Sequence, residues 1–130
     1  MKLTFAAEDC VIGAICGLLL LMYAGKIYPL KLNPYVYAVI FAILIIFIFF
    51  DVIHEFSDLS THPFFILFSI LHSLVDLALA LAFISFFAQV NIPYVTTMLV
   101  PLISETSIYY AGIFMVVANV LWIIFLPFVY

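Results

Sequence analysis

Two ionisable residues, His72 and Asp76, interrupt a strongly apolar stretch of the chain, FFILFSILHSLVDLALALAF. Residues four apart lie on one face of a helix, so the imidazole and the carboxyl group are placed to interact. Such a pair can exchange a proton, hold a cation, ligate a metal or cofactor, or only fix helix packing through a hydrogen bond. The same face continues through Ser69, Ser73 and Ala80.

A second, denser group of ionisable residues occupies the segment DVIHEFSDLSTHP. Carboxylates combined with imidazoles suit zinc, manganese or iron, so this segment is a candidate site for one of these divalent ions. The alternative is a solvated helix end, because charges gather where water reaches the chain. The candidate metal ligands are Asp51, His54, Glu55, Asp58 and His62.

A third polar feature lies in the last apolar stretch, which begins near Glu105 and contains Asn119. Ser104 can cap a helix there, and a carboxylate in the first turn is stabilised by the helix dipole. Counting residues from the helix ends places Asn119 and Cys16 at about the depth of His72, near the middle of a bilayer. The predicted path for protons or cations therefore consists of His72, Asp76, Asn119 and Glu105.

Catalytic motifs are missing from the sequence. His54 and Glu55 are not followed by a second histidine four residues on, and there is no Gly-x-Ser-x-Gly, Gly-rich phosphate loop or CxxC. Cys10 and Cys16 lie too far apart around a helix to form a disulfide, so we expect free thiols. The sequence therefore favours a non-enzymatic protein.

The composition of the chain indicates the class of protein in which these polar residues occur. Of the 130 residues, 70% are hydrophobic and 8% are charged, and the three basic residues are all lysines. A soluble domain is about 25% charged, so this composition excludes a soluble enzyme, a disordered tail and a secreted disulfide scaffold. Nucleic-acid binding is excluded because it needs clustered Lys or Arg. The chain is predicted to be an integral membrane protein with the lipid bilayer as its partner.

Four stretches are long and apolar enough for transmembrane helices of roughly 20 residues. The predicted fold is all-α, one domain over residues 1–130 with four membrane-spanning helices in a compact bundle. A shorter apolar segment at 93–103 is expected to form an interfacial or re-entrant helix before the last span. The predicted spans are 10–28, 34–56, 63–88 and 104–126.

Topology is predicted from the lysines. Lys26 and Lys31 lie in the first loop against Lys2 at the N-terminus, which favours a cytoplasmic first loop and both termini outside. Glu8 and Asp9 precede the first apolar run, unlike a signal peptide, so we expect that span to be retained.

Together these features predict a small non-enzymatic subunit of a homo-oligomer or of a larger membrane complex. Its polar core would handle protons or cations, with His72 and Asp76 midway between the acidic segment 51–62 and Glu105. The alternative is a metal-binding membrane enzyme or redox protein that uses the 51–62 cluster.

Overall fold

The computed structural model describes residues 2–25, 32–57 and 63–129, and within them it contains helices and no strand. The prediction of an all-α fold is confirmed. The helices are α1 (Lys2–Tyr23), α2 (Pro34–Ser57), α3 (Pro63–Ala88), α4 (Val95–Met98), the 3-10 helix η1 (Val100–Leu102) and α5 (Glu105–Val129).

Local sequence signals account for where the long helices begin. α2 and α3 start at Pro34 and Pro63, and proline suits a first helical position because the amide there needs no intrahelical partner. Ser104 caps α5, since its Oγ accepts a hydrogen bond of 3.2 Å from the backbone N–H of Ser107. At the other end of α1, Gly25 takes a φ of 76°, which favours glycine and turns the chain out of the helix.

Two helices differ from the predicted bounds. α1 begins at Lys2 and ends at Tyr23, so it lies several residues nearer the N-terminus than the predicted span 10–28. The difference arises because the acidic pair does not stop the helix: Glu8 is exposed, and Asp9 is buried against polar groups of other helices. α5 continues to Val129, three residues beyond the predicted end of the last span at residue 126.

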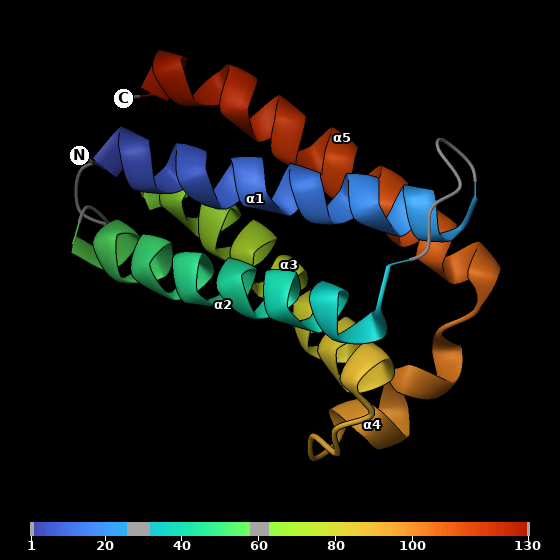
Figure 1. The fold of residues 1–130 in the computed structure, drawn as a ribbon. Helices are drawn as coiled ribbons and strands as arrows, with labels where there is room; N and C mark the ends of the chain where they lie inside the picture. The colour runs from blue at the N-terminus through green and yellow to red at the C-terminus, as the bar shows by residue number, and fades with distance from the viewer. Residues whose placement is uncertain (1, 26–31, 58–62, 130) are drawn as a thin grey trace.

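The four long helices run in alternating directions, and both ends of the described chain lie at the same end of the molecule (Figure 1). α1 packs most extensively against α5, α2 packs against α3, and α1 also contacts α2. Backbone contacts between α3 and α5 are few. Side chains therefore make most of the connection between those two helices.

Glycines allow the close approach of α1 and α5. A Cβ on Gly17 would lie 2.8 Å from the carbonyl oxygen of Gly112, and a Cβ on Gly112 would lie 2.9 Å from the carbonyl oxygen of Gly17. A Cβ on Gly13 would lie 2.6 Å from Nδ2 of Asn119. Small residues that let helix backbones approach are typical of membrane helix pairs, and here they also make room for a polar side chain.

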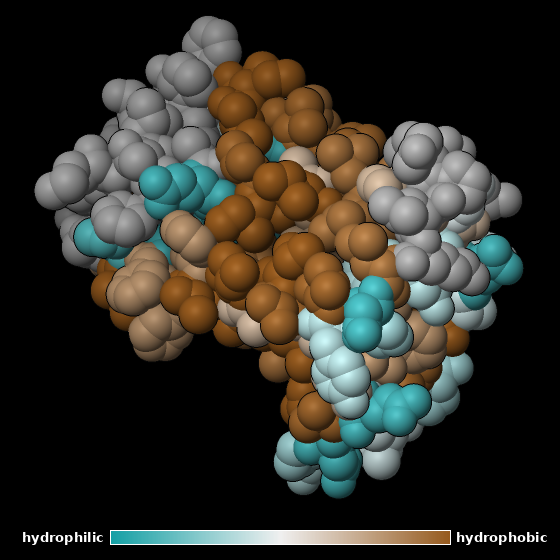
Figure 2. Space-filling model, viewed as in Figure 1, coloured by the Kyte–Doolittle hydropathy of each residue, from teal (hydrophilic) through white to brown (hydrophobic). Residues whose placement is uncertain are grey.

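Among the described residues, three helices are long and apolar enough to cross a membrane: α2 over Pro34–Phe56, α3 over Pro63–Ala88 and α5 over Glu105–Phe125. Large apolar side chains such as Phe64 and Phe68 point outward, as lipid-facing residues do. Apolar surface covers the central helices, and hydrophilic residues gather near α4 (Figure 2). These features indicate a multi-pass membrane protein.

Aromatic rings fill the half of the interior that lies away from the chain termini. The rings of Tyr37 and Phe87 stack with centroids 4.6 Å apart, and Tyr23 meets Phe87 edge-on at 5.1 Å. Phe41 and Phe83 stack at 5.4 Å one layer closer to the middle. This half is a packed apolar core, whereas the half nearer the termini contains the buried polar residues.

Candidate functional site

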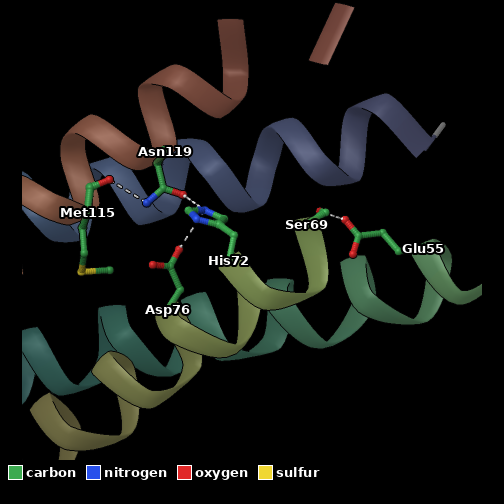
Figure 3. Close-up of polar contacts among 6 residues, drawn as sticks. All are labelled: Glu55, Ser69, His72, Asp76, Met115 and Asn119. Atoms are coloured by element: carbon green, nitrogen blue, oxygen red, sulfur yellow. Dashed lines mark hydrogen bonds and ion pairs between the residues drawn. The ribbon is translucent and has the colours of Figure 1, made fainter. Parts of the chain in front are cut away.

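His72 lies at the centre of a polar contact between α3 and α5. Its Nε2 atom is 3.1 Å from Oδ1 of Asn119 and 3.4 Å from Oδ2 of Asp76 (Figure 3). Asp76 and Asn119 are both fully buried, and His72 is nearly so. The structure thus brings together three of the four residues of the predicted proton or cation path.

The amide of Asn119 fixes the hydrogen-bonding role of His72. Nδ2 of Asn119 donates a 2.7 Å hydrogen bond to the backbone carbonyl of Met115, one turn earlier on α5. Oδ1 is then the atom that faces the imidazole, and because it can only accept, Nε2 of His72 carries the proton. The absent side chain of Gly13 leaves the space in which the amide sits.

The ring of His72 also stacks on Trp122 of α5. The two rings are 5.4 Å apart between centroids and 14° from parallel, and Trp122 stacks in the same way on Phe65 at 5.3 Å. The indole ring therefore covers one face of the imidazole and fixes the plane of its ring. Because the chain has one tryptophan, its fluorescence reports on this site alone.

Three carboxyl groups form a second buried cluster, which we call the acidic trio: Asp9, Asp51 and Glu55. The side chain of Asp51 is hydrogen-bonded to those of Asp9 on α1 and Glu55 on its own helix. Glu55 also accepts a hydrogen bond from Oγ of Ser69 on α3 (Figure 3). Each of the three is at most 4% exposed. The acidic trio therefore ties α1, α2 and α3 together with polar groups alone.

The acidic trio and the His72 contact interact with one another. Asp9 interacts electrostatically with Asp76, and Asp51 does so with His72. Cys16, which was expected at this depth, is buried and interacts with Asp76. Both cysteines are free thiols, as the sequence predicted. The two clusters of buried polar groups thus lie close enough to interact electrostatically.

Several oxygen atoms in this region are buried without a hydrogen-bonding partner in the described part of the chain. They belong to three helices. Asp76 contacts His72 at 3.4 Å and also interacts with the side chain of Asn119. Buried polar atoms are nearly always satisfied, by protein or by internal water, so these point to an unseen donor. The atoms are Asp9 Oδ1, Glu55 Oε2, Ser73 Oγ and both carboxyl oxygens of Asp76.

The structure does not bring Glu105 to this region. Glu105 is exposed in the first turn of α5, and Asn119 lies fourteen residues further along the helix, about 21 Å away at the rise of an α-helix. The helix dipole stabilises a carboxylate at this position, which explains an acidic residue here without a role in proton transfer. The predicted path therefore does not extend to the opposite end of the molecule through this residue.

The predicted metal ligands are divided among different surroundings. Asp51 and Glu55 face the interior, His54 is half-buried, and Asp58 and His62 lie outside the described residues. Across residues 2–25, 32–57 and 63–129, no three histidine, cysteine, aspartate or glutamate side chains are arranged to hold a metal ion.

Sequence reasoning missed the burial of Asp9 and the stacking of Trp122. A helix-end aspartate next to an exposed glutamate resembles an ordinary solvated charge, and only the packing of α1 between α2 and α5 turns it inward. A signal was present in GAICG, residues 13–17, whose two glycines four apart are typical of a helix-pairing face. That face is the one that approaches α5.

A scan against protein-family models and searches of curated proteins and solved structures found no match to this chain. The function must then be inferred from the buried polar residues. These residues are carboxylic acids, an imidazole, an amide and serine hydroxyls, all of which donate or accept hydrogen bonds.

Proposed function

We propose that this chain is a small, non-enzymatic membrane subunit whose His72 and Asp76 take up and release protons inside the bilayer. The observation that supports it most is Asp76, which is fully buried in mid-helix and lies 3.4 Å from the imidazole of His72. An ionised group within a membrane helix is unfavourable by roughly 2.5–3.5 kcal/mol on insertion scales. A serine or an asparagine would fix the packing without this penalty.

The proposed architecture is a single four-span bundle. α1 is about 33 Å long at the rise of an α-helix, enough to cross the hydrocarbon core beside the three spanning helices. It packs against α5 through glycines and against α2, so it belongs to the same bundle. The lysines favour both termini outside, at the end where the acidic trio lies.

Protons fit this interior better than metal ions do. The hydrogen bonds among Asp9, Asp51 and Glu55 join carboxyl groups directly, and each such bond needs a proton on one partner. A bound metal would require the same carboxylates to be ionised and to converge on one point, and in the described part of the chain they do not. The metal-dependent alternative therefore finds less support than a proton site.

The packing of the interior favours a role in an assembly. The polar region reaches from the helix ends near the termini to Asp76, and beyond it the interior is filled by rings such as Phe41 and Phe83. A single chain therefore provides about half of a path across the membrane. We propose that another copy of the chain, or another membrane subunit, provides the remainder.

Proton flux in proteoliposomes tests this function. The chain, alone or with the subunits that purify with it, would be reconstituted with a pH-sensitive dye inside the vesicles and a potassium-diffusion potential across them. We expect flux with the native chain and its loss with Asp76→Asn, which keeps the shape of the side chain but cannot release a proton. The matched control is Glu8→Gln, an exposed acid on α1. Flux that persists in Asp76→Asn, or none above empty vesicles, would overturn the proposal.

A further inference from the structure

The acidic trio lies at one end of the bundle, the end that carries both chain termini. Glu55 is two residues from the end of α2, and Asp9 is seven residues from the start of α1. These positions correspond to about 3 Å and about 10 Å of helix, respectively. Asp51, one turn deeper than Glu55, is hydrogen-bonded to both. The trio therefore forms a connected set of carboxyl groups between the membrane surface on that side and the interior.

Ser73 continues this set toward Asp76. It lies on the buried face of α3, one turn beyond Ser69, which is bonded to Glu55, and one turn before Asp76. Its side chain is 1% exposed, and its Oγ has no hydrogen-bonding partner in the described part of the chain. A serine in a helix readily bonds to the carbonyl one turn earlier, so an unpartnered hydroxyl points to a donor or acceptor other than the protein.

Internal water can supply the hydrogen-bonding partners that these atoms lack. From Ser69 to Asp76 the distance along α3 is about 10 Å, which a few water molecules can bridge. Each water in such a position makes about three hydrogen bonds, and the unpartnered atoms of Asp9, Ser73 and Asp76 offer them from two helices. The titratable groups that interact with His72 are Asp51 on α2 and Asp76 on α3. Asp9 and Cys16 on α1 interact in turn with Asp76.

We propose that the acidic trio and Ser73 bind a short chain of internal water that loads hydrated protons onto His72 and Asp76 from one side of the membrane only, the side of the chain termini. This inference rests on the proposed proton function and adds the route and its direction. A proton enters at Glu55 or Asp9, passes through Asp51 and the water at Ser73, and reaches the carboxylate of Asp76. Because Nε2 of His72 already carries a proton, the imidazole takes up its further proton from this water at Nδ1. The stacked rings beyond Asp76 close the other side.

The fluorescence of Trp122 tests the direction. A protonated imidazole in contact with an indole ring quenches its emission, and Trp122 stacks on His72. The full chain would be reconstituted with an N-terminal tag, vesicles with the tag outside would be selected, and the pH would be lowered on one side at a time. We expect quenching when the tag side is acidified and none when only the opposite side is. His72→Gln should remove the response and so identifies its source.

Variants of the loading route test its residues. Asp51→Asn, Glu55→Gln and Ser73→Ala should each slow the quenching by about a hundredfold, the lower bound for a positioned proton-transfer group. Ser73→Ala gives the clearest test. The Oγ atom of Ser73 has no hydrogen-bonding partner in the described part of the chain, so its removal is not expected to unfold the protein. The matched control is Glu8→Gln, which changes an exposed acid next to Asp9.

Two results would overturn the loading route: quenching from both sides, or a Ser73→Ala rate equal to that of the native chain. Its failure is distinguishable from that of the proposed function. Absence of flux together with one-sided quenching contradicts proton transport and supports the route. Flux that depends on Asp76, together with quenching from both sides, contradicts the route alone.

Discussion

At the scale of single residues, the central feature is a histidine whose neighbours determine its chemistry. Asn119 accepts the Nε2 proton, Trp122 stacks on the imidazole ring, and Asp76 lies 3.4 Å from the same nitrogen. The amide bonds to the Nε2 proton, which the neutral and the charged imidazole both carry here, and the indole stacks on the face of the ring in either form. His72 is therefore held in place in both protonation states, as a site that takes up and releases protons requires.

Replacing Asn119 should loosen this arrangement. Asn119→Leu removes the acceptor of Nε2 and leaves a buried donor unpaired, which is destabilising by about 1–3 kcal/mol. We expect a lower melting temperature in detergent and a changed Trp122 emission, because the imidazole loses its fixed position. Val117→Leu, at an exposed position on the same helix, is the control. Equal melting temperatures for the two variants would show that the amide does not anchor His72.

At the scale of helices, the interface between α1 and α5 positions the site. Gly13 and Gly17 let α1 approach until the amide of Asn119 occupies the place of a side chain. The helix that carries Asp9 thereby comes to lie against both α5 and α2. One close helix pair thus positions groups of the acidic trio and of the His72 contact.

Adding a methyl group at Gly13 tests this positioning. In Gly13→Ala the new Cβ would lie 2.6 Å from Nδ2 of Asn119, so the amide or the helix must move. Overpacking of this kind is destabilising by about 1–3 kcal/mol, which exceeds the gain in helix propensity of about 0.5–1 kcal/mol. We expect a lower melting temperature and weaker stacking on Trp122. Val11→Ile, which adds a carbon to the outer face of the same helix, should change neither. A native-like spectrum and stability for Gly13→Ala would contradict the proposed role of this glycine.

The helices could largely be predicted from the sequence, because the signals that begin and extend them are local to each helix. Apolar runs of spanning length and prolines at first helical positions determined α2 and α3, and Ser104 with Glu105 determined the start of α5. The depth count placed Asn119 opposite His72 because neighbouring helices run in opposite directions. The start of α1 was missed because an acidic residue gives no sign of whether protein or water will surround it.

The site was predictable only in part, for the same reason. Spacing along one helix relates His72 to Asp76, but it does not give the rotation of α1 that turns Asp9 inward and Glu8 outward. That rotation is decided by glycine contacts with α5, which depend on residues about one hundred positions away. The segment 51–62 was a candidate metal site because carboxylates and imidazoles are metal ligands. In the structure Asp51 is buried, whereas His54 is half-buried.

At the scale of the whole molecule, the interior has two halves of opposite character. The half near the termini contains the acidic trio, Ser73 and the His72 contact, and the other half is packed with aromatic rings. A polar region that ends in mid-membrane does not by itself carry anything across. It suits a subunit that exchanges protons with one compartment and completes its path in an assembly.

The central claim is that Asp76 exchanges its proton with water inside the membrane. Infrared difference spectra of the chain in lipid, recorded between acidic and alkaline buffer, test it directly, because a protonated carboxyl group has its own carbonyl band. We predict a band that appears in acid, shifts in heavy water and is missing from Asp76→Asn, while Glu8→Gln keeps it. A native spectrum from which Asp76→Asn removes no pH-dependent carboxyl band would contradict the account.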